Sequence, residues 1–288
     1  MGNARVAMPP SVFLTVVLAV LSSCARAVPP PVPGPTGHET PERAAKADAD
    51  LAAPAPVEPA LLPPVAPEVV AHGSRSVRTV ALTFDACSTR DVSKYDERIT
   101  QELIANNAPA TIFLGGSWAK EEAAHVRELA RHPELFELGN HTFTHPHMPA
   151  VKDDARVRQE LLRTQAEVRA LTGRTPLLWR PPYGEYDARV VKLAAEVGLT
   201  TIEYDLASGD PDAHATKEKL VEWVLKKVQP GSIVVMHINH RSFHTSEALP
   251  SIIQGLRAKG YQLVTVGEML RESHGLPVAM LTLDAGVP

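Results

Sequence analysis

The chain has 288 residues, of which 44% are hydrophobic, and this is enough material for a sizeable buried core. Its formal net charge is only −4, with no basic stripe and no long acidic run, so the composition gives no sign of a nucleic-acid-binding protein or of an acidic solvating tail. It has two cysteines, Cys24 and Cys87, and removal or lipidation of Cys24 would leave Cys87 without a disulfide partner.

The N-terminal segment has the pattern of an export signal. Arg5 precedes an apolar run at 11–21, which is short for a membrane span and typical of a signal-peptide core. The stretch LSSC resembles a bacterial lipobox ending at Cys24, whereas cleavage after Ala27 is the ordinary alternative. We therefore expect residues 1–27 to direct the protein to the cell envelope, with a lipid anchor as the favoured form and a secreted or periplasmic protein as the other.

A linker is expected next. Residues 28–77 are rich in Pro and Ala and contain no aromatic residue, so they cannot bury enough apolar surface to offset their ordering entropy. This composition predicts a disordered, extended linker that lets a tethered domain reach away from its anchor. The expected domain spans 78–272, and residues 273–288 form a C-terminal tail.

From residue 78 onward, short apolar runs alternate with amphipathic segments. We expect strands at 79–86, 110–116, 135–141, 176–182, 200–206, 232–238 and 261–266, and helices near 94–106, 118–132, 153–172, 187–197, 216–228 and 246–259. About seven strands alternating with helices favour an α/β fold with a parallel sheet. The number suits a distorted, incomplete (β/α) barrel better than a small open sheet, although periodicity alone does not exclude a doubly wound fold.

Reactive side chains stand where the expected strands end. These residues are Asp85, His141, Arg180, Asp205 and His237. Because the carboxyl ends of parallel strands share one face of a β/α fold, we expect these distant residues to converge on a site there.

The motifs TFDA, NHTFTH, RPPYG, SGDP and MH occur in that order, each near a strand end. As a set, this resembles the NodB-homology polysaccharide deacetylases, over about residues 78 to 272, and the closing segment 248–270 is also similar to the end of that family. The resemblance implies a distorted, incomplete (β/α) barrel that binds a divalent metal, most commonly Zn²⁺, and removes acetyl groups from N-acetylated sugars.

Catalytic roles follow from the same resemblance. Asp85 matches the catalytic base, oriented by Arg180, and His237 matches the catalytic acid, supported by Asp210. The backbone N–H of Tyr183 matches the oxyanion donor. This division suits the chemistry, because an acetamide is a poor electrophile and its amine must be protonated to leave.

His141 and His145 match the metal-binding histidines of the family, and imidazole is a good ligand for zinc. The family's first motif usually reads TFDD, in which the second aspartate is a metal ligand, but this chain has Ala86 there. Two histidines alone fall short of the three protein ligands expected at a catalytic zinc. A further departure is Pro211, where the family usually has a tryptophan that lines the sugar groove.

Three residues are candidates to replace the missing ligand. Asp96, near the start of the next helix, is our preferred candidate, although an acid at that place also suits a helix N-terminus. Asp85 could turn onto the metal and lose value as a base, and Cys87 is a soft ligand two residues further on.

The expected function is that of an exported, metal-dependent deacetylase acting on polysaccharide that contains N-acetylglucosamine. Peptidoglycan is the favoured substrate, because an anchor and a long linker would hold the domain near the cell wall. Two alternatives stay open: a non-catalytic glycan-binding relative that has lost its metal, and an O-acetyl esterase or other amide hydrolase with the same mechanism.

Overall fold

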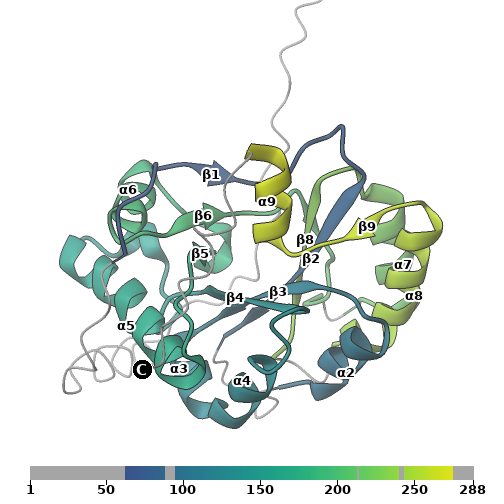
Figure 1. The fold of residues 1–288 in the computed structure, drawn as a ribbon, viewed down its shortest axis with the longest axis horizontal. Helices are drawn as coiled ribbons and strands as arrows, with labels where there is room; N and C mark the ends of the chain where they lie inside the picture. The colour runs from purple at the N-terminus through teal and green to yellow at the C-terminus, as the bar shows by residue number, and fades with distance from the viewer. Residues whose placement is uncertain (1–61, 88–94, 213, 240–242, 275–288) are drawn as a thin grey trace, which may run out of the picture. The chain divides into compact units, whose positions relative to one another are not determined.

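The computed structural model describes residues 62–87, 95–212, 214–239 and 243–274, which form a curled parallel sheet with helices around it (Figure 1). In spatial order, the strands are β1 (Val69–Val70), β6 (Thr200–Ile202), β5 (Leu178–Trp179), β4 (Phe136–Asn140), β3 (Ala110–Leu114), β2 (Thr79–Ala86), β8 (Ser232–His237) and β7 (Leu206–Ala207). β9 (Gln262–Leu263) pairs with the start of β2. The sheet is an incomplete barrel, which confirms the predicted fold class.

The helices follow the strands along the chain. They are α2 (Glu97–Ala105), α3 (Gly116–Glu121), α4 (Ala123–Leu129), α5 (Asp154–Thr172), α6 (Ala188–Glu196), α7 (Lys217–Lys227), α8 (Thr245–Ala258) and α9 (Val266–His274), with 3₁₀ turns η1 (Met148–Ala150) and η2 (Pro182–Gly184). Side chains of Asp96, Asp153, Asp187 and Thr216 cap α2, α5, α6 and α7 by accepting from the first-turn N–H groups. None of the helices in the described ranges is long and apolar enough to cross a membrane.

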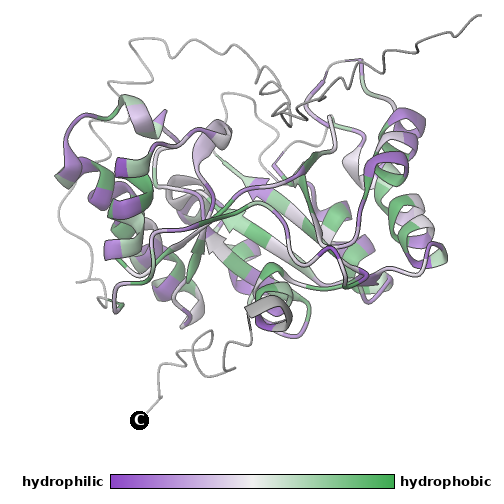
Figure 2. Cartoon of the chain, turned by 90° about the horizontal axis from the view of Figure 1, so that it is seen from above, coloured by the Kyte–Doolittle hydropathy of each residue, from purple (hydrophilic) through white to green (hydrophobic). Residues whose placement is uncertain are grey.

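The two faces of the sheet are buried in different ways. On one face, Leu82 and Phe84 belong to a large cluster that the sheet shares with α2, α3, α7 and α8. On the other face, Ala81 and Phe113 pack with Met269 of α9. Figure 2 shows the hydrophobic strands between helices whose outer faces are hydrophilic. Burial on both sides explains why β2 reads as a nearly unbroken apolar run.

The expected elements are present with a few differences. The run at 200–206 splits into β6 and β7, and the helix expected at 118–132 is divided at Glu122 into α3 and α4. β1 and α9 were not expected from the sequence pattern. β1 has only two residues, Val69 and Val70, between a proline-rich stretch and polar residues, which is too short to show a period.

Residues 62–77 lie within the expected linker but are part of the fold, so the domain begins earlier than residue 78. Leu62 is buried against Gly198, whose φ of +78° and close approach leave no room for a Cβ. β1 pairs with β6, and Gly73 then donates to the carbonyl of Gly231 beside β8. Composition averaged over a long window hid these few apolar contacts. The expected signal segment 1–27, residues 28–61 of the expected linker and residues 275–288 of the expected tail lie outside the described residues.

Candidate active site

The predicted base and acid lie on neighbouring strands. Asp85 near the end of β2 and His237 at the end of β8 are direct register partners. Adjacent strands run about 4.8 Å apart, so the two backbones are held close by the sheet itself. The side chain of Asp85 is 9% exposed and that of His237 is 25% exposed. The geometry brings together two groups that are far apart in the sequence.

Arg180, at the end of β5, holds the Asp85 carboxylate. It is fully buried, and its Nη1 donates to Asp85 Oδ1 at 2.9 Å and to Thr83 Oγ1 at 2.8 Å. Burial raises the pKa of Asp85, but the charge of Arg180, followed by those of His141 and His237, outweighs it and lowers the pKa overall. The carboxylate is therefore kept ionised, as a base requires.

Asp210 holds His237 from two directions. Its Oδ1 lies 2.9 Å from His237 Nδ1, and its Oδ2 accepts from the His237 backbone N–H at 2.7 Å and from Thr245 Oγ1 at 2.8 Å. Burial lowers the pKa of His237, but the charge and the hydrogen bond of Asp210 raise it overall. With Nδ1 engaged, Nε2 is the ring nitrogen that can exchange a proton with a substrate.

The rings of His141 and His145 are in edge-to-face contact just beyond β4. Their ring centroids are 4.9 Å apart, and His141 Nε2 lies 3.9 Å from Asp85 Oδ2. His141 Nδ1 is 2.9 Å from the carbonyl of Arg180, which assigns its proton to Nδ1 and leaves the Nε2 lone pair toward the site. Burial is the largest influence on His141 and lowers its pKa, which favours the neutral, metal-binding form.

Glu160 of α5 fixes the turn between these histidines, and sequence reasoning missed it. Its Oε2 accepts from the N–H groups of Phe143 and Thr144, both at 2.8 Å, and its Oε1 accepts from Thr144 Oγ1 at 2.6 Å. Thr142 and His145 both have positive φ, at 63° and 60°, which is uncommon for residues with a Cβ. The three bonds offset the cost of that backbone. In the sequence, Glu160 reads as an ordinary polar residue of an amphipathic helix.

A cluster that can hold a metal forms beside the base. Ligand atoms of Cys87, His141 and His145 all lie within 4.8 Å of one another. Two imidazole nitrogens and a sulfur are a donor set that divalent zinc accepts. The residues present therefore fit the cation that the resemblance implies.

Asp96, the preferred replacement ligand, is not part of this cluster. It caps α2, and both carboxylate oxygens are engaged by Arg98: Oδ1 accepts from Nε and Oδ2 from Nη2, each at 2.7 Å. The structure therefore favours the ordinary role of Asp96 as an acid at a helix N-terminus. Arg98, two residues further along the chain, supplies a matching fork of donors.

Asp205 does not join the site either. Its carboxylate accepts from Ser232 Oγ and from Ile233 N–H at the opening of β8, and it pairs with Arg75 at 2.7 Å. It therefore serves the amino-terminal end of β8, opposite to the end that carries His237. The expected strand at 200–206 breaks before this residue, so Asp205 precedes β7 and does not close β6.

Tyr183 lies in η2, three residues beyond Arg180. Its φ is 62°, its ring centroid is 4.6 Å from that of His145, and its ring stacks on His147 at 4.0 Å. Nδ1 of His147 is in turn 2.7 Å from a carboxylate oxygen of Glu185. The main chain of Tyr183 is thereby held beside the histidine cluster, where the resemblance requires an oxyanion donor.

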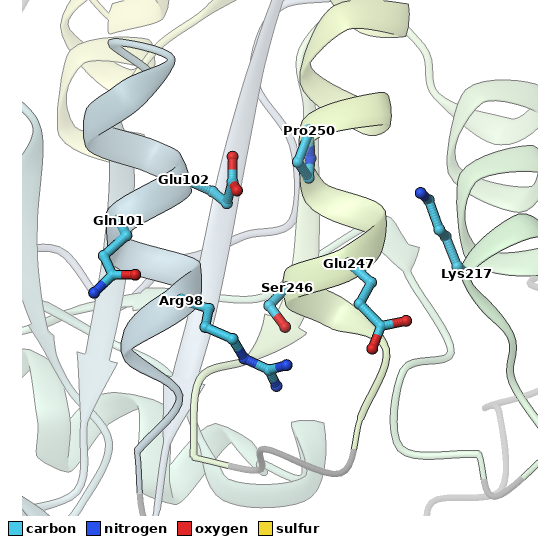
Figure 3. A pocket seen from close by; sticks show the side chains of 7 residues that line it. All are labelled: Arg98, Gln101, Glu102, Lys217, Ser246, Glu247 and Pro250. Atoms are coloured by element: carbon cyan, nitrogen blue, oxygen red, sulfur yellow. The ribbon is translucent and has the colours of Figure 1, made fainter.

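A separate hollow of about 350 Å³ lies between α2 and α8 (Figure 3). The residues that line it are Arg98, Gln101, Glu102, Lys217, Ser246, Glu247 and Pro250. None of them belongs to the acid–base pair or to the cluster of Cys87 and the two histidines. This hollow is therefore separate from the predicted site.

An arginine-held carboxylate on one strand and a carboxylate-held histidine on the next are what a hydrolase needs to take and return a proton. This arrangement is typical of a hydrolase. The family model described as polysaccharide deacetylase matches residues 72–202. The chain is also 30% identical, over 200 residues, to a peptidoglycan-N-acetylglucosamine deacetylase of Bacillus cereus, covering 68% of this chain and 90% of that one. It belongs to the polysaccharide deacetylase family.

Two further relatives limit what the fold and the family imply about activity. The uncharacterized protein YlxY of Bacillus subtilis is 28% identical, and the chain spans 54% of its length. Among solved structures, BA3943 of Bacillus anthracis, described as a pseudoenzyme of the CE4 family, superposes with a TM-score of 0.64 at 29% identity, covering 72% of this chain and 70% of that one. The fold alone therefore does not establish activity, and the residues of the site must carry that argument.

Proposed function

We propose that this protein is an active, metal-dependent deacetylase that removes N-acetyl groups from N-acetylglucosamine-containing polysaccharide, with peptidoglycan as the favoured substrate. The observation that carries the proposal is the pairing of Asp85 with His237 across β2 and β8, each held by its own charged partner. A module that only binds glycans has no use for an acid and a base in register.

Each residue of the chain has a distinct task in the proposed reaction. Asp85, kept ionised by Arg180, takes a proton from the attacking water. The Tyr183 N–H donates to the oxygen that gains negative charge. His237, whose raised pKa is due to Asp210, gives its proton to the departing amine nitrogen. The acetamide is thus split into acetate and a free amine.

Cys87, His141 and His145 are the residues that would hold the cation. A bound divalent metal supplies charge stabilisation and makes a nearby water more acidic. We propose zinc as the metal, because nitrogen and sulfur donors favour it over magnesium or calcium.

The proposed substrate follows from relatives. Several are peptidoglycan deacetylases by name, including the Bacillus cereus protein and one of Listeria monocytogenes that is 30% identical over 204 residues. An export signal at 1–27 and a linker from residue 28 would place the domain at the cell wall, with Cys24 as the proposed lipid-anchor site.

The direct test is acetate release by the purified chain. We expect release from N-acetylglucosamine oligomers and from peptidoglycan, loss of release with a strong chelator, and its return with zinc. Asp154→Asn changes an exposed carboxylate that pairs with Arg189 and serves as the matched control, with a rate equal to wild type. No acetate from any N-acetylated glycan, with folded and metal-loaded protein, would contradict the proposal.

Ala86 favours one rival, a glycan-binding relative without its metal, as BA3943 shows that the fold persists in a pseudoenzyme. That rival predicts glycan binding that is unaffected by chelator and no bound metal. The other rival, an O-acetyl esterase, predicts acetate from acetylated xylan and none from N-acetylated glycans.

A further inference from the structure

The family's usual carboxylate ligand is replaced here by Ala86, which is fully buried and cannot coordinate a metal. We propose that Cys87 takes its place, and that its thiolate forms a Cys-His-His metal site with His141 and His145. This inference deepens the proposed function and rests on it for the presence of a metal.

Geometry is the first argument. A tetrahedral zinc with Zn–S of about 2.3 Å and Zn–N of about 2.0 Å places its donor atoms roughly 3.3 to 3.6 Å apart. The donor atoms of the three residues lie within 4.8 Å of one another. Small movements of these side chains would therefore close the set around one cation.

The surroundings of Cys87 are the second argument. Asn239 is 1% exposed, and its Nδ2 donates to the Cys87 carbonyl at 2.6 Å and lies 3.6 Å from Sγ. An N–H directed at sulfur stabilises the thiolate and fixes its orientation. The bond from His141 Nδ1 to the Arg180 carbonyl does the same for that ring. Such outer partners are what hold the ligands of a metal site in place.

The competing ligands are already engaged. Asp96 would have to leave both donors of Arg98, and Asp85 already gives one carboxylate oxygen to the buried guanidinium of Arg180. Removing one partner of a buried ion pair strands the other charge, which is costly. Like a carboxylate, a thiolate brings one negative charge, so the replacement keeps the net charge of the site while favouring softer metals.

The test is cobalt substitution in the full-length chain carrying Cys24→Ser, so that Cys87 is the only thiol. We expect one Co²⁺ per chain and a sulfur-to-cobalt charge-transfer band in the near ultraviolet. Adding Cys87→Asp should keep the bound cobalt and abolish the band. Adding Cys87→Ser should weaken cobalt affinity by about 10-fold or more. Asp96→Asn is the matched control and should change neither the stoichiometry nor the band.

Cobalt bound without a band in the Cys24→Ser chain would overturn the inference, and so would loss of cobalt in Asp96→Asn. If Cys87→Ser does not fold, circular dichroism will show it, and Cys87→Asp still decides the question. A chain that shows the band but releases no acetate supports the thiolate ligand and contradicts the proposed function. The inference about Cys87 and the proposed function can therefore be refuted independently.

Discussion

At the carboxyl end of the sheet, Asp85 lies against the guanidinium of Arg180, whereas near the opposite end Glu137 of β4 is bonded to a hydroxyl and a backbone amide. Glu137 Oε2 accepts from Thr111 Oγ1 at 2.7 Å and from Gly267 N–H at 2.9 Å, which ties the first turn of α9 to the sheet. The pKa of Asp85 is lowered, while burial raises that of Glu137. One carboxyl group is held ready to carry charge, and the other serves as a hydrogen-bond acceptor.

The two shifts have opposite consequences for stability. Because the pKa of Asp85 is lowered in the folded chain, its contribution is present above its ordinary pKa and is lost as pH falls through the lowered value. Glu137 holds its proton more tightly in the folded chain, so stability falls as pH rises from its ordinary pKa through the raised value. The partner of a carboxyl group decides whether its charge stabilises the fold.

Asp85→Asn is expected to have the largest effect on both rate and stability. It removes the proposed base and leaves the fully buried Arg180 without its carboxylate. We expect acetate release to fall by about 10² to 10⁴-fold and stability to fall by about 3 kcal/mol or more. Rate assays and urea unfolding at neutral pH measure the two effects. A variant that kept its rate would show that another group is the base.

Glu160→Ala tests the comparison between the two ends of the sheet. Glu160 lies at the functional end, but it resembles Glu137 in its neutral partners and raised pKa. Its loss frees the histidine turn, so we expect zinc affinity, measured by chelator competition, to fall by about 10 to 100-fold. Glu160→Gln keeps acceptors for the N–H groups of Phe143 and Thr144 and is the matched control, with a much smaller loss. Equal affinity in all three proteins would mean that the turn holds its shape without Glu160.

Asp210→Asn tests how the charge of Asp210 affects His237, the proposed acid. Removing this carboxylate takes away the interaction that raises the pKa of His237, so the protonated acid should persist over a narrower range. We expect the alkaline limb of kcat/KM to move to lower pH and the rate above neutrality to fall about tenfold. Asp205→Asn alters a carboxylate at the other end of β8 and should leave the limb in place. An unmoved limb in Asp210→Asn would assign it to a different group.

The smallest effect is expected for Glu137→Gln. Its amide oxygen can still accept from Thr111 and Gly267, so only the unfavourable charge is lost, and stability at neutral pH should change by less than about 1 kcal/mol or rise. Glu137→Ala leaves both donors unsatisfied and should cost about 1 to 3 kcal/mol. Urea denaturation at pH 7 compares them, and a larger loss in Gln than in Ala would contradict the acceptor role.

The sequence predicted best what depends on long apolar runs. β2, β3 and β8 are buried on both faces, and their hydrophobic stretches place Asp85 and His237 at strand ends without any alignment. Motif order then supplied the roles of Arg180 and Asp210. The two-residue β1 and the division at Glu122 depend on tertiary contacts that leave no periodic trace.

The replacement ligand could not be chosen from the sequence, because the choice depends on what else each side chain meets. From the sequence, Asp96 suits a metal ligand and a helix cap equally well. The structure shows that Arg98 engages both of its carboxylate oxygens. The proximity of Cys87 to the two histidines depends on the turn that Glu160 holds, 73 residues further along the chain. Pairwise contacts over such separations have no local signature.

The pairing of β2 with β8 also bears on how this protein can change over time. Main-chain hydrogen bonds, which every residue type except proline supplies, set the spacing between proton acceptor and proton donor. Substitutions of side chains outside these two strands would leave that spacing in place. Recognition can drift while the reacting pair keeps its alignment.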